Sequence, residues 1–245
     1  MKAKQRAKVM QALHRSRMAP YLSEAGGNDK DALDLYLWNL KLTAAVQEVL
    51  GVTEVILRNA MDRELQRWNS KKAGAKTSWL MQEPETPLRG LVNKKRKQAL
   101  HRAKKEANSR PYGHPRRGAA VCHDDVLAQL MFGTWKDLLP NHAPNAGAAQ
   151  HNINRERMWN EALQNAFPYE ADLDGKKTYW RVAHLHLLRN RVSHMDSLLN
   201  IDVKDRIQDA FKLVGSVDPA LRDWVTGFSR VSEIYRDRPR ARKGP

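Results

Sequence analysis

The chain has 245 residues, with 43 lysines and arginines against 27 aspartates and glutamates, which gives a formal net charge of +16. A chain this basic is expected to bind a polyanion, such as nucleic acid or an acidic membrane surface. No segment approaches the ~20 consecutive apolar residues of a membrane-spanning helix, and no apolar signal peptide opens the sequence, so we expect a soluble, cytoplasmic protein with no membrane partner. The single cysteine, Cys122, excludes an internal disulfide and a cysteine-rich zinc site.

The N-terminal half is predicted to be helical. Residues 1–27 form a basic N-terminal arm, either a helix or a disordered tail, and residues 28–235 form the main domain. The arm ends at the turn signal Gly-Gly-Asn, residues 26–28. Apolar residues then recur at alternating steps of three and four, which predicts one buried stripe on a long helix or on two helices broken near Gly51. These residues are Leu35, Trp38, Leu42, Ala45, Val49, Val52 and Ile56.

A basic insertion occupies about residues 88–120, after a connection at 69–87 that contains helix-breaking residues. Ten lysines and arginines against one glutamate lie between Asn93 and Arg117, which predicts a basic helix followed by a loop. Such a run is either a solvated helix face or a surface that holds a nucleic-acid backbone, whose binding would weaken steeply with salt. The candidate binding residues are Lys94, Lys95, Arg96, Lys97, Arg102, Lys104, Lys105, Arg116 and Arg117.

The C-terminal half is also predicted to be helical, and the fold class is therefore all-α. A core helix at 126–139 precedes a loop at about 140–152. Helical spacing then returns in three segments, before a basic C-terminal tail at 236–245; the segments are 154–167, 178–199 and 203–235. No run alternates β-branched and aromatic residues with polar ones, so strands are not expected.

One run carries residues suited to RNA cleavage. Residues 187–194 read Leu-Leu-Arg-Asn-Arg-Val-Ser-His near the end of an apolar segment. Cutting RNA without a metal requires a group that exchanges a proton with the 2′-hydroxyl or the leaving oxygen, and a cation that stabilises the charged phosphate. Histidine and arginine are suited to these two roles. A charged helix end would show the same residues without any catalytic role.

Helix geometry does not decide which arginine works with His194. At about 100° per residue, Asn190 shares a face with His194, and Arg191 lies close to it in projection. Arg189 points roughly 140° away from His194 on the same ideal helix. Geometry alone therefore nominates Asn190, Arg191 and His194, and Arg189 would have to reach around the helix or work at a distorted helix end.

No metal site or cofactor is expected. His184 and His186 are two residues apart and point about 200° away from each other on a helix, which is poor for chelation. No cluster of carboxylates joins them in the sequence. Nothing in the surroundings of Cys122 gives it a nucleophilic role.

Four stretches give the chain a family resemblance. Residues 189–194 resemble the Arg-x4-His signature of HEPN ribonucleases, and the stretches as a set are similar, in the same order, to signatures of the Abi-like (abortive infection) branch. They are 36–40 (Tyr-Leu-Trp-Asn-Leu), 54–60 (Glu-Val-Ile-Leu-Arg-Asn-Ala), 126–135 (Val-Leu-Ala-Gln-Leu-Met-Phe-Gly-Thr-Trp) and 188–194 (Leu-Arg-Asn-Arg-Val-Ser-His). The resemblance covers about Tyr36 to Leu199. It departs at Met195-Asp196, where the family commonly has a second histidine and an acidic residue, and in the strongly basic stretch from Asn93 to Arg117.

The resemblance implies an HEPN-like helical bundle that dimerises, so that the Arg/His motifs of two chains meet in a shared cleft. It implies that Arg189 and His194 are catalytic and that Asn190 orients the histidine or the phosphate. The family pattern thus favours Arg189 where helix projection favours Arg191. The supporting residues are Glu54, Arg58, Asn59 and Arg191. Glu54 and Arg58 are either an ordinary i,i+4 ion pair or a pair that positions the catalytic residues.

The implied activity is metal-independent cleavage of RNA that leaves a 2′,3′-cyclic phosphate and a 5′-hydroxyl, in an abortive-infection or toxin-type antiphage defence protein. The implied partners are substrate RNA and a second copy of the chain, with a bound structured RNA and a protein antitoxin as further candidates. The alternative is a non-catalytic RNA-binding protein with a structural HEPN dimer. A DNA-binding regulator is disfavoured because the sequence shows neither a helix-turn-helix nor zinc-finger spacing.

Overall fold

The structure, a computed structural model, describes residues 2–73, 78–144, 146 and 150–239. These residues form helices and connections with no β-strand among them, so the prediction of an all-α fold is confirmed. The elements are α1 (Ala3–Leu13), α2 (Arg15–Glu24), α3 (Asp29–Ala73), α4 (Leu88–Asn108), α5 (His123–Leu127), α6 (Phe132–Leu138), α7 (Gln150–Glu161), the 3-10 helix η1 (Leu163–Ala166), α8 (Lys176–Ser193), α9 (Val203–Val217), α10 (Pro219–Phe228) and α11 (Val231–Arg236). No helix in the described part of the chain is both long enough and apolar enough to span a membrane.

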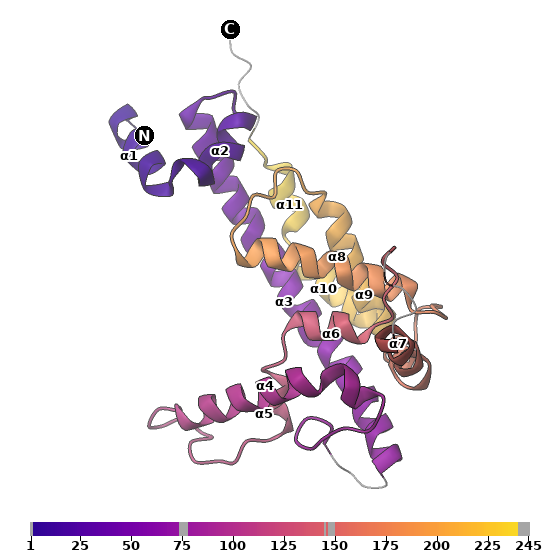
Figure 1. Ribbon diagram of the computed structural model, residues 1–245. Coiled ribbons are helices and arrows are strands. Elements are labelled where there is room, and N and C mark those ends of the chain that lie inside the picture. Colours follow the sequence, from indigo (N-terminus) through magenta and orange to yellow (C-terminus); the bar gives the residue numbers. More distant parts are fainter. Residues whose placement is uncertain (1, 74–77, 145, 147–149, 240–245) are drawn as a thin grey trace.

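The 45-residue helix α3 is the spine of the molecule (Figure 1), and α2, α8, α9 and α11 all contact it. Asn28 begins it, because its side-chain oxygen accepts hydrogen bonds from the backbone N–H groups of Lys30 and Asp31. The apolar pattern left open a break near Gly51, and the structure shows none. A glycine inside a helix costs about 1 kcal/mol relative to alanine. Buried side chains on both sides of Gly51, including Leu50 and Leu57, offset that cost.

The N-terminal arm is helical and packed. Met18 and Tyr21 of α2 are wholly buried, and the Tyr21 ring meets the Tyr36 ring of α3 edge to face with centroids 5.3 Å apart. A disordered tail, the other form considered for residues 1–27, therefore does not apply to the described part of the arm. The packing of α2 on α3 joins the arm to the main domain.

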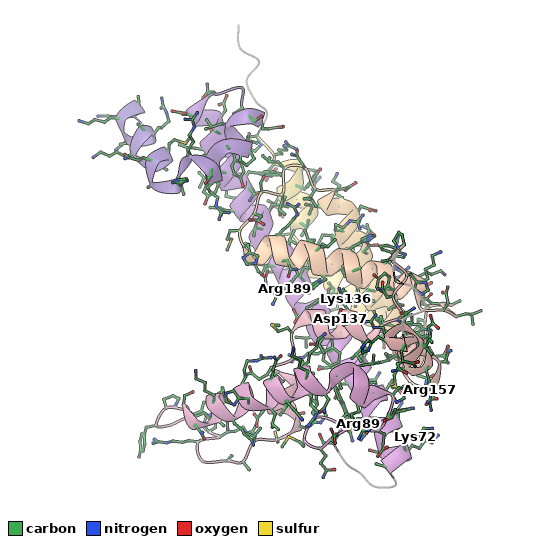
Figure 2. The ribbon with its side chains drawn as sticks, in the orientation of Figure 1. Lys72, Arg89, Lys136, Asp137, Arg157 and Arg189 are labelled. Carbon is green, nitrogen blue, oxygen red and sulfur yellow. The ribbon has the colours of Figure 1, made fainter. Side chains whose placement is uncertain are left out.

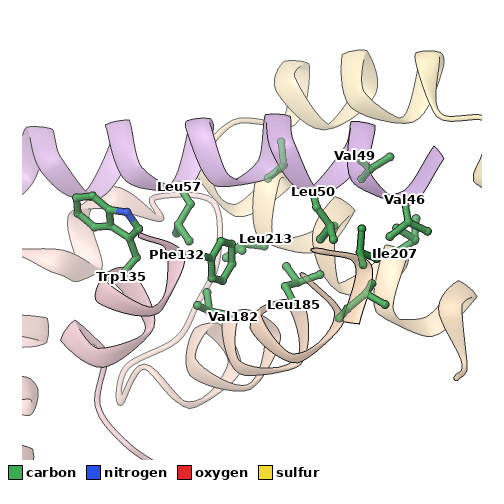
Figure 3. Packing of buried hydrophobic residues seen from close by; sticks show 14 of the residues in the cluster. Val46, Val49, Leu50, Leu57, Phe132, Trp135, Val182, Leu185, Ile207 and Leu213 are labelled. Atoms are coloured by element: carbon green, nitrogen blue, oxygen red, sulfur yellow. The ribbon is translucent and has the colours of Figure 1, made fainter. Parts of the chain in front are cut away.

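The core that positions α8 lies between α3, α6, α8 and α9 (Figure 3). The inward stripe of α8 recurs every three or four residues, as expected for a helix with one buried face. Figure 3 shows Leu185 and Val182 of α8 beside Leu57, Phe132 and Leu213. The stripe consists of Val182, Leu185, Leu188 and Val192, all at most 2% exposed.

The basic insertion is the long helix α4 followed by a loop, as predicted. Helix α4 contacts α5, α6 and α7 at one end of the molecule (Figure 1). Its buried side consists mainly of small or apolar residues, such as Val92, Ala99 and Ala103. The insertion is therefore packed on the rest of the fold along one face and exposed along the other.

Several predicted boundaries were wrong. The segment 178–199 is helical only to Ser193, because Met195 takes a left-handed backbone (φ 54°) that ends the helix. The segment 203–235 is three helices, because Asp218 and Pro219 start α10 as its cap and first residue. Helix α7 already begins at Gln150, inside the loop predicted at 140–152, and residues 145 and 147–149 of that loop lie outside the described residues.

The core helix predicted at 126–139 is instead two short helices, because α5 ends at Leu127 and α6 begins at Phe132. The ends of two other predicted segments shift slightly. Helix α3 continues to Ala73, into the connection predicted at 69–87, of which residues 74–77 lie outside the described part. In the predicted C-terminal tail, Arg236 ends α11 and Arg238 forms an ion pair with Glu24 of α2. Residues 240–245 of that tail lie outside the described residues.

Candidate active site

The end of α8 borders an open groove of about 650 Å³. Asn190, Arg191 and His194 all line it, which is the set that helix projection nominated. The groove is also bordered by His184, earlier on α8, and by Arg206 of α9. The remaining lining residues are Leu187, Leu188, Asp196, Asn200, Ile201 and Asp202. Three cationic or titratable side chains from α8 and one from α9 therefore face a space large enough for a nucleotide.

Arg189 does not line this groove. It lies on another flank of α8 and faces α3, where its Nε is 4.0 Å from Oε2 of Glu54. Figure 2 shows Arg189 on the side of α8 nearest α6, where Lys136 and Asp137 are labelled. Within one chain, the two arginines of the motif therefore have different surroundings. Arg191 shares the groove with His194, and Arg189 contacts a glutamate.

Glu54 joins the predicted supporting residues to Arg189. Burial raises the pKa of Glu54, while the positive charges of Arg189 and Arg58 oppose that rise. The ion pair found for Glu54 within the described residues is with Arg189, and the Arg58 guanidinium instead donates a 3.4 Å hydrogen bond to Oδ1 of Asn59. A partly buried carboxylate beside a catalytic candidate is a common feature of functional sites.

The turn after α8 involves a residue that the sequence interpretation missed. Arg17 of α2 donates hydrogen bonds to the backbone oxygens of Met195 (2.6 Å) and His194 (3.4 Å), and its guanidinium is 3.9 Å from Asp196. No sequence signal links positions 17 and 195, because the contact depends on how α2 packs against the far end of the chain.

The two other histidines of α8 point to different places. His184 Nδ1 donates to Oδ2 of Asp209 on α9 at 2.8 Å, and that carboxylate also accepts from Arg206 at 3.2 Å. The His186 ring stacks on Phe132 with centroids 5.9 Å apart, and burial and nearby cations such as Lys136 lower its pKa. Among the described residues, no group of three or more His, Cys, Asp and Glu side chains converges as a metal site would require.

The nine cations predicted to bind RNA divide into two groups. Lys94, Lys97, Lys104 and Lys105 are exposed and fall within roughly a 100° arc of α4, and Arg117 is exposed in the loop that follows. We call the four lysines the α4 basic face. They lie opposite the buried side of the helix.

The other cations hold the fold together. Arg96 is buried and donates to the backbone oxygen of Leu80 and to Asn93, so its prediction as an RNA contact was wrong. A dense run of charges wraps around a helix, so some of its cations fall on the packed side. Three further cations are also held by the fold: Lys95 pairs with Asp137, Arg102 donates to the backbone oxygen of Gln129, and Arg116 pairs with Asp125.

A Ser-His-Asp arrangement lies elsewhere, and its geometry indicates a structural role. Oγ of Ser78 is 2.7 Å from Nδ1 of His123, whose Nε2 is 3.0 Å from Asp62. The same Ser78 oxygen accepts hydrogen bonds from the backbone N–H groups of Leu80 and Met81. Both lone pairs of the Ser78 oxygen therefore accept backbone hydrogen bonds, which makes this oxygen a poor nucleophile. The arrangement links the segment after residue 77 to α3 and α5.

Comparisons with protein-family models, with curated proteins and with solved structures find no match to this chain. The resemblance to HEPN ribonucleases therefore rests on the four stretches quoted above.

Replacing Glu54 is expected to change how stability depends on pH. Because its folded-state pKa is raised above the ordinary value of 4.5, the folded chain keeps this proton to a higher pH than the unfolded chain does. The free energy of unfolding should then fall as pH rises from 4.5 through the folded-state pKa. In Glu54→Gln this fall should be absent. Urea unfolding from pH ~4 to ~8 measures it. Glu233→Gln, at an exposed glutamate of α11, is the control, and parallel curves for wild type and Glu54→Gln would contradict the assignment.

Proposed function

We propose that the protein is a metal-independent endoribonuclease that uses His194 in proton transfer and Arg189 as the phosphate-stabilising cation. The observation that carries the proposal is the convergence of His194, Asn190 and Arg191 on one open groove at the end of α8. Histidine exchanges protons near neutral pH, and guanidinium groups pair with phosphate oxygens. The strongly basic chain is suited to a polyanionic substrate.

The proposed reaction is a transesterification within RNA. The 2′-oxygen attacks the adjacent phosphorus and loses its proton, while the bond from phosphorus to the 5′-oxygen breaks and that oxygen gains a proton. His194 exchanges one of these protons, and arginine neutralises the charge on the non-bridging oxygens. The products are a 2′,3′-cyclic phosphate and a 5′-hydroxyl. DNA is not cleaved because it lacks the 2′-hydroxyl.

The two arginines are proposed to have different roles. Arg189 lies 4.0 Å from the Glu54 carboxylate, which favours one orientation of its guanidinium, and a preorganised cation stabilises a transition state better than a mobile one. Arg191 is exposed in the groove, where it is suited to binding the RNA on either side of the scissile bond. This assignment agrees with the Arg-x4-His resemblance and gives Arg191 the supporting role.

The position of Arg189 supports the proposal of a homodimer. In one chain Arg189 and His194 lie on different flanks of α8, so a site that uses both needs a second copy. The outward face of α8 carries Leu187, which is 63% exposed one turn before Asn190. We propose that a second copy packs against this end of α8, with Leu187 in the contact, and that the partly exposed Arg189 of one copy, on the flank beside Glu54, comes within reach of His194 of the other.

The α4 basic face is proposed to hold the RNA backbone. Four exposed lysines on one side of a helix form an electrostatic track that needs no base contacts. The same face is suited to a bound structured RNA, and an antitoxin would be a further partner.

Together with the Abi-like resemblance, these features lead us to propose an abortive-infection or toxin-type antiphage role in the cytoplasm. The competing proposal is a non-catalytic RNA-binding protein with the same dimer, favoured by the exposed position of His194 in a single chain.

Cleavage is expected to depend on His194. His194→Ala should lower the rate about 10²-fold or more in buffer containing EDTA, because general acid–base catalysis contributes about that much. Arg189→Gln should lower kcat, and Arg191→Gln should mainly raise KM. The measurement follows a labelled RNA and the end groups of its products. His151→Ala, at an exposed histidine of α7, is the control. If wild type and His194→Ala bind RNA equally and neither cleaves it, the non-catalytic proposal is the correct one.

A composite site predicts complementation between inactive chains. Arg189→Gln and His194→Ala chains are mixed and allowed to exchange, so that half of the dimers contain one chain of each kind. Each mixed dimer has one intact site of its two, so about a quarter of the wild-type activity should return. A site within one chain would leave the mixture inactive. Leu187→Asp should dissociate the dimer in analytical ultracentrifugation. Leu173→Asp, at a leucine that is 89% exposed outside α8, should not.

Neutralising the α4 basic face is expected to weaken RNA binding and its salt dependence. Lys97→Gln with Lys104→Gln should lower the slope of log affinity against log salt by about two, because each phosphate contact contributes about one. The measurement is fluorescence anisotropy with a labelled RNA in the His194→Ala background. Lys30→Gln with Lys212→Gln removes the same charge from exposed lysines outside α4, and an equal loss in that control would contradict the assignment.

A further inference from the structure

We infer that Arg17, in helix α2 of the N-terminal arm, is a positioning residue for His194. The effect on catalysis rests on the proposed function, whereas the contact itself is independent of it. Arg17 is 177 residues before His194, in the arm that lies outside the family resemblance. The structure therefore assigns a role in the site to a segment that would otherwise be a basic extension.

His194 is the C-cap of α8, where the helix gives way to a strained turn. Met195 has a φ of 54°, a left-handed conformation that a residue with a side chain rarely adopts. The carbonyl groups at a helix C-terminus have no partner within the helix and carry partial negative charge. A turn of this kind persists only where neighbouring groups hold it in place.

Arg17 supplies that support from another element. Its Nη1 donates to the backbone oxygen of Met195 at 2.6 Å and to that of His194 at 3.4 Å. Its guanidinium also lies 3.9 Å from the Asp196 carboxylate. One cation therefore contacts three successive residues, beginning with His194, and complements the charge of the helix end.

The base of the Arg17 side chain is rigid enough to serve as a reference point. Met18, its neighbour in α2, is wholly buried, and Tyr21 packs edge to face on Tyr36 of α3. The chain leaves α8 at the end nearer α2 (Figure 1). On the other side of the turn, the backbone N–H of Leu198 donates to the buried Oδ1 of Asn39 on α3 at 2.8 Å. The turn that carries His194 is thus tied to α2 and α3 at both ends.

Arg17 acts through the backbone, since its bonds are to carbonyl oxygens and to Asp196. If the turn loosens, the His194 imidazole shifts relative to Asn190 and Arg191 while all three remain present. Small displacements of a catalytic group lower the rate more than they weaken binding. Arg17→Gln is therefore expected to lower kcat by about tenfold or more while KM changes by less than about twofold.

The test compares Arg17→Gln, Arg17→Lys and Arg15→Gln in the full chain. Arg15 is an exposed arginine of the same helix and serves as the matched control. Circular dichroism and thermal unfolding establish that each variant is folded. Kinetics with a labelled RNA separate kcat from KM. Imidazole resonances of His194 in ¹H–¹⁵N spectra, assigned by their absence in His194→Gln, report the position of the ring without requiring any activity.

The expected result is a shifted or broadened His194 resonance and a lowered kcat in folded Arg17→Gln, partial recovery of both in Arg17→Lys, and wild-type behaviour in Arg15→Gln. Unchanged His194 resonances and kcat in folded Arg17→Gln would overturn the inference. If the wild-type protein cleaves no RNA but the resonance still shifts, the positioning contact stands and the proposed function fails. The two failures are therefore distinguishable.

Discussion

The rotation of α8 about its own axis is the constraint on which the site depends. Val182, Leu185, Leu188 and Val192 form a nearly solvent-free stripe toward the core, and rotating the helix would expose this apolar surface. Full burial of one such side chain stabilises a fold by about 1.5–3 kcal/mol, so the four together hold the helix firmly. Once the stripe is buried, Leu187, Asn190 and His194 must face outward, and the two arginines of the motif must lie on opposite flanks.

The positive charge of the chain serves two separate purposes. Arg96 is buried, and Arg17 binds the carbonyl oxygens of a turn, so these cations stabilise the protein itself. The lysines of the α4 basic face extend from the opposite side of their helix into solvent. Only these exposed lysines can bind a polyanion and release the counterions that surround it. The net charge of +16 therefore overstates the charge that is available to a partner.

Much of the fold was predictable because helical periodicity is local. The stripe along α3, the helical character of α4 and the absence of strands all follow from spacing within one segment. Helix ends were harder: the end of α8 depends on a left-handed Met195, for which the sequence offers no glycine as a signal. The grouping of Asn190, Arg191 and His194 followed from helix projection, whereas the pairing of Arg189 with Glu54 was not predicted, because it depends on how α8 packs on α3.

Contacts between distant segments could not be predicted in this way. The spacing of residues in the sequence predicts neither the burial of Arg96 nor the hydrogen bond from Arg17 to Met195. Each depends on how separate segments of the chain pack together. Runs of positive charge are especially misleading as predictors of a binding surface. The sequence does not show whether a given lysine or arginine faces solvent or bonds to a carbonyl oxygen within the fold. Arg96 was predicted to bind RNA for this reason, and Arg17 was counted only as part of a basic arm.

The regularity of α8 bears on how an Arg-x4-His motif can act at all. Five residues along an ideal helix turn the side chain by roughly 140°, so Arg189 and His194 leave a regular helix on different flanks. The structure shows a regular α-helix from Lys176 to Ser193, with His194 as its cap. A distorted helix end, which would turn Arg189 toward His194, is therefore not found here. This geometry favours the proposal that a phosphate contacts Arg189 of one copy and His194 of another.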